Sequence, residues 1–193
     1  MVSTALVVEA RTKCQDCYAT YAIYQDRIRT YKLRIKLQAF LGLAGPVAVG
    51  SAAAAYGLES KLTGFLVVLG ALLLVPLTLI SLWALIAGWE SELRNAVQGS
   101  YDNFRFYQRF KLLLTQQELS DASFRKELNA IDEAAMHSIK QDVEAIVKDS
   151  EKCYGHRAAL KELQLSCATC GEVPRDIKPT NCGTCGKFLK WRF

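Results

Sequence analysis

Two long stretches without a charged residue, 37–58 and 62–89, constrain this chain most. Only Glu59, Ser60 and Lys61 separate them. An apolar run of about 18 residues or more is long enough to cross the roughly 30 Å apolar core of a bilayer as a helix. A helix also satisfies its own backbone hydrogen bonds in that environment. The pattern therefore predicts a tight hairpin of two membrane-spanning helices.

A helical hairpin buried in a large soluble core would have a similar composition, and this interpretation is the alternative. The chain has 193 residues, and about half of them are hydrophobic. A protein of this size has little further sequence with which to cover two such helices on every side. The membrane interpretation is therefore favoured.

Basic residues cluster on both sides of the predicted hairpin. They are Arg27, Arg29, Lys32, Arg34 and Lys36 before it, and Arg94, Arg105, Arg109 and Lys111 after it. The link holds one base, Lys61, beside Glu59. The positive-inside rule therefore predicts that both termini lie in the cytoplasm.

The two stretches differ in their side chains. Small residues recur in the first at steps of four, whereas Leu and Val dominate the second. Because small residues let helix backbones approach closely, the first span is predicted to pack on other helices and the second to face lipid. The residues predicted to make these packing or pore contacts are Gly42, Gly45, Ala48, Gly50, Ser51 and Ala52. Charged residues are missing from both spans, which argues against a transporter with a buried charge relay.

Three further helices are predicted outside the hairpin. Residues 7–35 place apolar side chains at alternating steps of three and four, and no Pro or Gly precedes Gly42, so this helix should run into the first span. Residues 90–118 should continue the second span as a helix. Ser120 is predicted to cap a last helix that reaches about residue 163. The three helices are expected to form an antiparallel cytoplasmic bundle.

The C-terminal region contains the most specific motif. Cys167 and Cys170 are followed by eleven residues and then by Cys182 and Cys185, with a Gly after each pair. Two residues between thiolates let both bind one tetrahedral ion, so four thiolates predict a closed structural zinc site. Two redox pairs or an iron–sulfur cluster are the alternatives. The thioredoxin-like alternative needs a strand–helix context that is missing here.

A second metal site is a further hypothesis. Cys14 and Cys17 near the N-terminus could share an ion with Cys153 and His156, if their helices pack side by side. Against it, Cys14 and Cys17 also fit the apolar face of their helix, where a free Cys behaves as a small hydrophobic residue.

The C-terminal tail, residues 187–193, mixes bases with aromatics. Such a tail could bind nucleic acid by stacking, although packing on the cysteine motif is favoured. The sequence shows no phosphate loop, nucleophile elbow or paired His, so it is not expected to be an enzyme.

These patterns predict an all-α membrane protein in four parts. Residues 1–36 are expected to form a cytoplasmic amphipathic helix, 37–89 the transmembrane hairpin, 90–164 a cytoplasmic helical bundle, and 165–193 a small four-cysteine zinc ribbon or knuckle.

The order of these parts resembles the SLATT two-transmembrane effector proteins of bacteria. The spacing of the four cysteines resembles the mobilome CxxCx(11)CxxC proteins, which we regard as a SLATT-like branch. The stretches 81–85 (SLWAL), 157–160 (RAAL) and 178–180 (KPT) are also similar to that branch. Cys14, Cys17 and Cys153 are not part of its pattern.

The resemblance implies a role in anti-phage defence at the bacterial inner membrane. It implies a homo-oligomeric effector that forms a pore or disrupts the membrane in abortive infection. It also implies a sensor partner, such as a nucleotide-signalling enzyme or a reverse transcriptase system. The alternative is a membrane-anchored adaptor whose zinc-binding part holds a protein or nucleic-acid partner.

Overall fold

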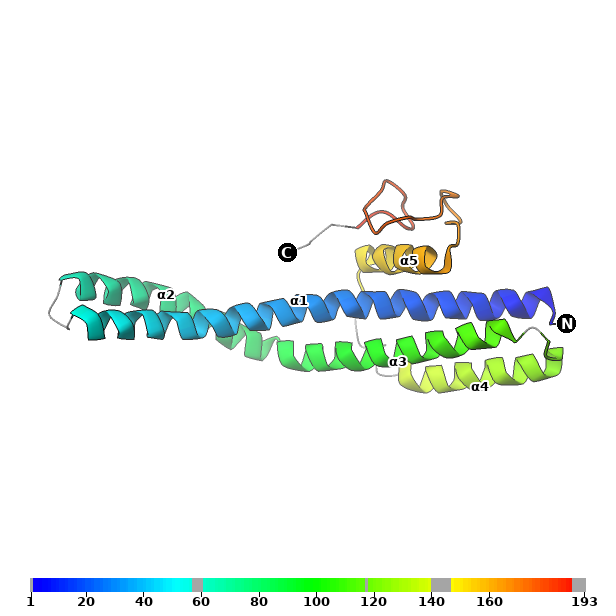
Figure 1. The fold of residues 1–193 in the computed structure, drawn as a ribbon, viewed down its shortest axis with the longest axis horizontal. Helices are drawn as coiled ribbons and strands as arrows, with labels where there is room; N and C mark the ends of the chain where they lie inside the picture. The colour runs from blue at the N-terminus through cyan, green and yellow to red at the C-terminus, as the bar shows by residue number, and fades with distance from the viewer. Residues whose placement is uncertain (1, 57–60, 117, 140–146, 189–193) are drawn as a thin grey trace. The chain divides into compact units, whose positions relative to one another are not determined.

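The computed structural model describes residues 2–56, 61–116, 118–139 and 147–188. The described residues form five α-helices and no β-strand, so the predicted all-α class is confirmed. In chain order the helices are α1 (Thr4–Tyr56), α2 (Lys61–Ile86), α3 (Trp89–Thr115), α4 (Asp121–Ile139) and α5 (Asp149–Leu163) (Figure 1).

The helices belong to two compact units. The larger unit combines Met1–Arg27 with Ala96–Phe193, and the smaller unit is Ile28–Asn95. Helix α1 contributes residues to both units because it runs without interruption for 53 residues. The expected continuation of the N-terminal helix into the first apolar stretch is therefore confirmed. Neither Pro46 in α1 nor Pro76 in α2 ends its helix.

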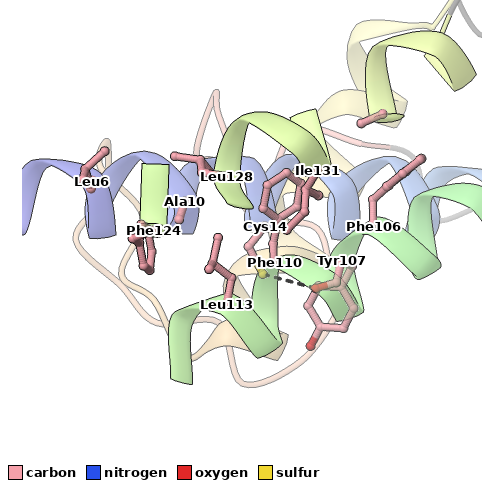
Figure 2. Close-up of a cluster of buried hydrophobic side chains, with 11 residues drawn as sticks. Leu6, Ala10, Cys14, Phe106, Tyr107, Phe110, Leu113, Phe124, Leu128 and Ile131 are labelled. Carbon is pink, nitrogen blue, oxygen red and sulfur yellow. Dashed lines mark hydrogen bonds between the residues drawn. The ribbon is translucent and has the colours of Figure 1, made fainter. Parts of the chain in front are cut away.

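The core of the larger unit lies between α1, α3 and α4 (Figure 2). Its fully buried side chains include Cys14, Tyr107, Phe110 and Phe124. Burying aromatic side chains of this size supplies most of the stabilisation of a small helical unit. The buried residues of this core are Leu6, Ala10, Cys14, Phe106, Tyr107, Phe110, Leu113, Phe124, Leu128, Ile131 and Ala135.

Polar contacts define the directions of these helices. The Ser3 amide donates to Asp121 at 2.8 Å, and Lys13 Nζ lies 2.7 Å from Asp132 Oδ1, so α4 runs parallel to α1. Cys14 lies beside Tyr107, and Gln25 Nε2 donates to Ser100 Oγ at 2.7 Å, so a later residue of α1 meets an earlier residue of α3. Helix α3 therefore runs antiparallel to α1 and α4. The predicted antiparallel bundle is therefore present.

Helix α5 packs on α1 through a close, polar contact. Gly155 lies where a Cβ atom would be 2.6 Å from the Ala19 carbonyl oxygen. At the start of α5, Arg27 donates two hydrogen bonds to the Glu151 carboxylate, at 2.8 and 2.9 Å. Such a bidentate pair fixes orientation as well as distance. The contact places α5 firmly along the N-terminal half of α1.

The last predicted helix is divided in two. Ser120 caps α4 as expected, because its side-chain oxygen accepts the Ser123 amide at 3.3 Å. The single helix to residue 163 was wrong, however. Lys148 has extended backbone angles and caps α5, and the Glu151 carboxylate accepts its amide at 2.9 Å. The division lets α5 pack on α1 instead of extending away along the α4 axis.

The predicted continuation of the second span into α3 was also wrong. Gly88 has a φ of +60°, a left-handed conformation that Gly adopts without strain, and it separates α2 from α3. The Ser91 hydroxyl and the Glu92 amide both donate to the Gly88 carbonyl oxygen, at 2.7 and 2.9 Å. These bonds start the new helix at Trp89.

The smaller unit exposes large apolar side chains. Leu43 is 70 % exposed in α1, and Leu72 and Leu85 are 68 % and 79 % exposed in α2. Among the described residues, one segment, Val68–Ile86, is long and apolar enough to cross a membrane, and it is 13 % buried. The expected first span, residues 37–58, is not identified by this criterion of length and hydropathy. Residues 57–60, which include most of the predicted link, lie outside the residues that the structure describes. One candidate span is therefore established, and the two-span hairpin stays a prediction.

Replacing Gly155 with Ala is expected to destabilise the larger unit, although Ala favours a helix over Gly by about 0.5–1 kcal/mol. The added Cβ would also lie 2.8 Å from Ile23 Cγ1. Overpacking of this kind costs about 1–3 kcal/mol, so the melting temperature followed by circular dichroism in detergent should fall. Gly64→Ala is the control, because a Cβ there meets nothing within 4 Å. A Gly155→Ala protein as stable as the wild type would contradict the α5–α1 contact.

Candidate metal centre

The four predicted cysteines lie together after the end of α5. The sulfur atoms of Cys167, Cys170, Cys182 and Cys185 all lie within 4.8 Å of one another. The Sγ atoms of Cys167 and Cys182 are 4.0 Å apart, and those of Cys170 and Cys185 are 3.8 Å apart. A tetrahedral ion with metal–sulfur distances of about 2.3 Å holds its ligand sulfurs about 3.8 Å apart. The four thiols are free. The cluster could therefore hold a metal ion.

The two cysteine pairs fold alike. Each reads Cys-x-Thr-Cys-Gly, and in each the amide of the Gly donates to the carbonyl oxygen of the first Cys, at 2.8 Å for Gly171 and 2.9 Å for Gly186. The hydroxyls of Thr169 and Thr184 meet at 2.6 Å and join the two turns. The result is two matching knuckles that face one another.

The local backbone favours glycine at both Gly171 and Gly186. Gly171 has a φ of +73°, which an L side chain rarely adopts. At Gly186 a Cβ would lie 2.7 Å from the Thr180 carbonyl oxygen and closer still to its hydroxyl. The two glycines therefore allow their knuckles to turn in two different ways.

Backbone amides favour the thiolate form of the first Cys in each knuckle. The amides of Cys185 and Thr184 donate to Cys182 and lower its thiol pKa to about 7. Burial raises the pKa of Cys167, but the amides of Cys170 and Thr169, together with the thiols of Cys185 and Cys170, outweigh that effect, so this pKa also lies below its ordinary value. Burial and the neighbouring cysteines raise the pKa of Cys185. Because only thiolates bind metal, amide donors prepare the first ligand of each pair.

The inner side of the cluster packs on α5. Cys167 and Cys185 are each 1 % exposed and lie against the buried Leu160, with Leu165 and Cys182 beside them. Cys170, by contrast, is exposed. An apolar inner side excludes water from two of the four sulfurs. The site is thus buried on one side and open to solvent on the other.

The second predicted site is not formed. Within the described part of the chain, the C-terminal group is the only such cluster placed to hold a metal ion. Cys14 is buried against Tyr107 in the core, and Cys153 Sγ donates to the Gly183 carbonyl oxygen at 3.2 Å. His156 Nδ1 lies 3.2 Å from Gln15 Nε2, and burial lowers its pKa. Cys14 and Cys17 therefore serve the hydrophobic packing that was the alternative.

The predicted packing residues of the first span are only partly described. Gly42, Gly50 and Ser51 are exposed, and a Cβ on either glycine would meet nothing within 4 Å. The surroundings of Gly45, Ala48 and Ala52 lie outside the described residues. Residues 189–193 of the C-terminal tail also lie outside them, so nucleic-acid binding by the tail stays a prediction.

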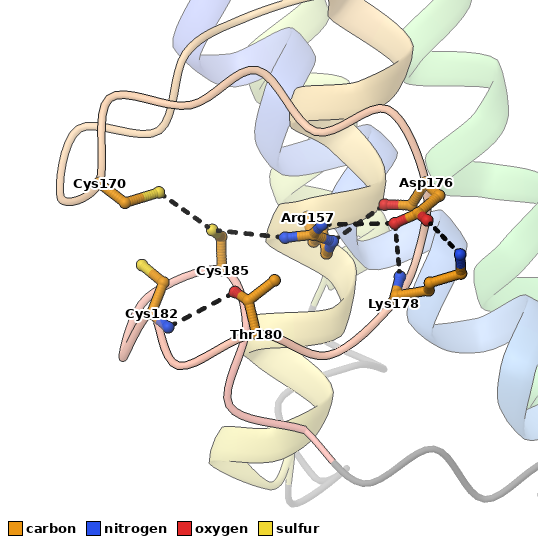
Figure 3. A network of polar contacts seen from close by, with 7 residues as sticks. All are labelled: Arg157, Cys170, Asp176, Lys178, Thr180, Cys182 and Cys185. Carbon is orange, nitrogen blue, oxygen red and sulfur yellow. Dashed lines mark hydrogen bonds and ion pairs between the residues drawn. The ribbon is translucent and has the colours of Figure 1, made fainter.

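Sequence reasoning did not assign a role to Arg157. This buried side chain on α5 contacts Cys185 and the spacer residue Asp176 (Figure 3). The stretches RAAL and KPT had been singled out, but only as a resemblance. They supply Arg157, Leu160 and Thr180, which contact residues of the cysteine cluster, and Lys178, which pairs with Asp176. The repeated Cys-x-Thr-Cys-Gly sequence was the available signal for the matching knuckles.

Fold and site define an all-helical protein with a C-terminal four-cysteine centre of metal-binding type. The family model described as "Mobilome CxxCx(11)CxxC protein" matches residues 8–188. The chain belongs to this family, as its cysteine spacing indicated. No curated protein and no solved structure matches the chain.

Metal analysis of the purified full chain should distinguish the two groups of cysteines. We expect one metal ion per chain, lost in Cys167→Ser because three thiolates hold a structural ion far more weakly than four. Cys14→Ala and Cys17→Ala should keep the full metal content. The measurement is elemental mass spectrometry after gel filtration. Loss of metal in either α1 variant would restore the second-site hypothesis.

The free energy of unfolding should fall as the pH rises through the alkaline range. Burial raises the pKa of Cys14 from near 9 to about 11, and burial first, then neighbouring charges, raises that of Cys17 to about 12. Above pH 9 and below these raised pKa values, the thiols lose protons in the unfolded state but keep them in the folded state. This difference stabilises the unfolded state. Urea unfolding at pH 8 and pH 10.5 should show a smaller fall for a Cys14→Ala, Cys17→Ala protein than for wild type. An equal fall would contradict this assignment.

Proposed function

We propose that this protein is a non-enzymatic effector of anti-phage defence in the bacterial inner membrane. Two spans would place both termini in the cytoplasm. A cytoplasmic signal would make the chains oligomerise and open a pore or disrupt the membrane, as in abortive infection. The proposal draws on the resemblance to SLATT proteins and on membership of a mobilome family.

The observation that carries the membrane part is the exposed apolar surface of the smaller unit. A soluble core helix is mostly buried, whereas Val68–Ile86 is 13 % buried. In α1, Phe40 and Val47 are 67 % and 63 % exposed, so the predicted first span is also uncovered. Exposed apolar surface of this extent is unfavourable in water and indicates lipid or further protein.

The cysteine centre supports a structural role in the larger unit. We propose that it binds zinc through Cys167, Cys170, Cys182 and Cys185. Four thiolate ligands leave no open coordination position, so the ion would supply folding energy rather than catalysis. The folded unit would then present a surface to a cytoplasmic sensor partner.

The open space around Gly50 supports assembly through α1. A Cβ atom added there meets nothing within 4 Å. We therefore expect a larger residue at Gly50 to act mainly through contacts with helices of other copies of the chain. Small residues at this face would let several copies pack closely around an opening.

A membrane-anchored adaptor is the second candidate. One side of the cysteine centre is open, because Thr169, Thr184 and Cys170 are exposed at the tips of the two knuckles. Such a surface suits a protein or nucleic-acid partner. In that case the apolar helices would be an anchor only.

Expression in bacterial cells should separate these functions. We expect membrane depolarisation and leakage of an impermeant dye from cells that hold the activated wild-type chain with its native operon under phage challenge. Gly50→Leu should reduce leakage at least tenfold at equal membrane level, because it blocks close packing of α1. Gly64→Leu is the matched control, since its site in α2 is equally open and is predicted to face lipid.

Three outcomes would count against the effector. Defence with an intact membrane throughout would favour the adaptor. Equal leakage from the Gly50→Leu and wild-type chains would contradict assembly through this face of α1. Replacement of the apolar helices by an unrelated anchor without loss of defence would also favour the adaptor.

A further inference from the structure

The spacer between the two cysteine pairs is tied to α5 at its middle. Arg157 Nε donates to the Asp176 carbonyl oxygen at 2.9 Å, and Arg157 Nη2 lies 3.5 Å from Asp176 Oδ1 (Figure 3). Lys178 Nζ pairs with the other carboxylate oxygen at 3.0 Å, and the Lys178 amide donates to Asp176 Oδ1 at 3.2 Å. The spacer is therefore closed around one side chain of the preceding helix.

The same guanidinium reaches the cysteine cluster. Arg157 Nη1 donates to Cys185 Sγ at 3.9 Å. Arg157 is 6 % exposed and Cys185 is 1 % exposed, so the contact is shielded from water. Arginine suits this place because its donors point along fixed directions, and one fork can serve two acceptors.

The two knuckles differ at their second cysteine. The Glu172 backbone amide donates to Cys170 within its own loop. Cys185 receives its donor from α5 instead, through the Arg157 side chain. One sulfur of the cluster is thus oriented by a residue that lies 28 positions away in the chain.

Charge explains why a buried cation is tolerated at this position. A divalent ion with four thiolates carries a net charge of −2. Burying a guanidinium costs free energy unless anions surround it, and here Asp176 and Cys185 lie on its two sides. A thiolate at Cys185 offsets that cost, and the arginine in turn offsets one charge of the loaded centre.

We propose that Arg157 is a positioning residue of the metal centre, which orients Cys185 for the ion and closes the spacer through Asp176. The inference rests on the zinc binding proposed above. It assigns to α5 a direct part in holding the ion, so metal loading and the packing of the C-terminal segment on α5 depend on one side chain.

The test compares Arg157 variants with Arg175→Gln, which removes the same charge from an exposed residue of the same spacer. Zinc affinity of the detergent-solubilised full chain is measured by competition with a chelating dye. Arg157→Gln should bind zinc about 10–100-fold more weakly, as outer-shell substitutions do. Arg157→Lys should fall between wild type and Gln, because it restores the charge without the fork. Arg175→Gln should remain within threefold of wild type.

Cobalt supplies a readout that a purely structural role would not change. In the Co²⁺-loaded chain, the sulfur-to-metal charge-transfer bands should shift in Arg157→Gln and Arg157→Lys but not in Arg175→Gln. Circular dichroism identifies any variant that fails to fold. If Arg157→Gln does not fold, Arg157→Lys decides: zinc affinity and cobalt bands equal to wild type would overturn the proposal.

The two levels of the proposal fail differently. A wild-type chain that holds no zinc and gives no cobalt charge-transfer bands would overturn the zinc site, and with it the role of Arg157. A wild-type chain that binds zinc tightly, with a folded Arg157→Gln protein that matches Arg175→Gln in affinity and spectrum, would overturn only the role of Arg157.

Discussion

Helix α1 is the common partner of the helices in the larger unit. Its first turns bury Leu6, Ala10 and Cys14 against α3 and α4, and its later turns receive α5 at Ala19. Small side chains at these points bring the helix axes close, while aromatic side chains from α3 and α4 fill the space between them. Without α1, α3 and α4 would each lose one of the two helices that cover their buried faces, and α5 would lose the helix on which it packs.

The metal centre depends on this arrangement through α5. That helix is short, and its contacts with α1 are largely polar, including the Arg27–Glu151 pair. Its other side supplies Leu160 to the cysteine cluster and Arg157 to both Cys185 and the spacer. A metal ion at the four sulfurs would therefore stabilise the C-terminal segment and α5 together, because the same helix supports both.

The smaller unit exposes large apolar side chains that need a partner in place of water. Side chains such as Leu72 and Leu85 are left uncovered by the chain itself. Lipid would satisfy them without any specific contact, whereas other copies of the chain would need complementary shapes. The effector and adaptor proposals differ at this point, since only the effector requires helix-to-helix packing in the membrane.

Much of this structure could be predicted from the sequence. Periodicity located the helix of residues 7–35, and the spacing of two cysteine pairs predicted a four-sulfur cluster, because both depend on residues close together in the chain. The break at Gly88, the separate α5 and the role of Arg157 were missed. The last two depend on which segments lie side by side: Gly155 contacts α1 only because α5 turns back onto that helix, and Arg157 meets Cys185 only because the spacer folds over α5. The local sequence pattern thus determined the all-helical class and the four cysteines of the cluster. Tertiary packing decided that the buried Arg157 lies beside Cys185, because that contact joins residues far apart in the chain.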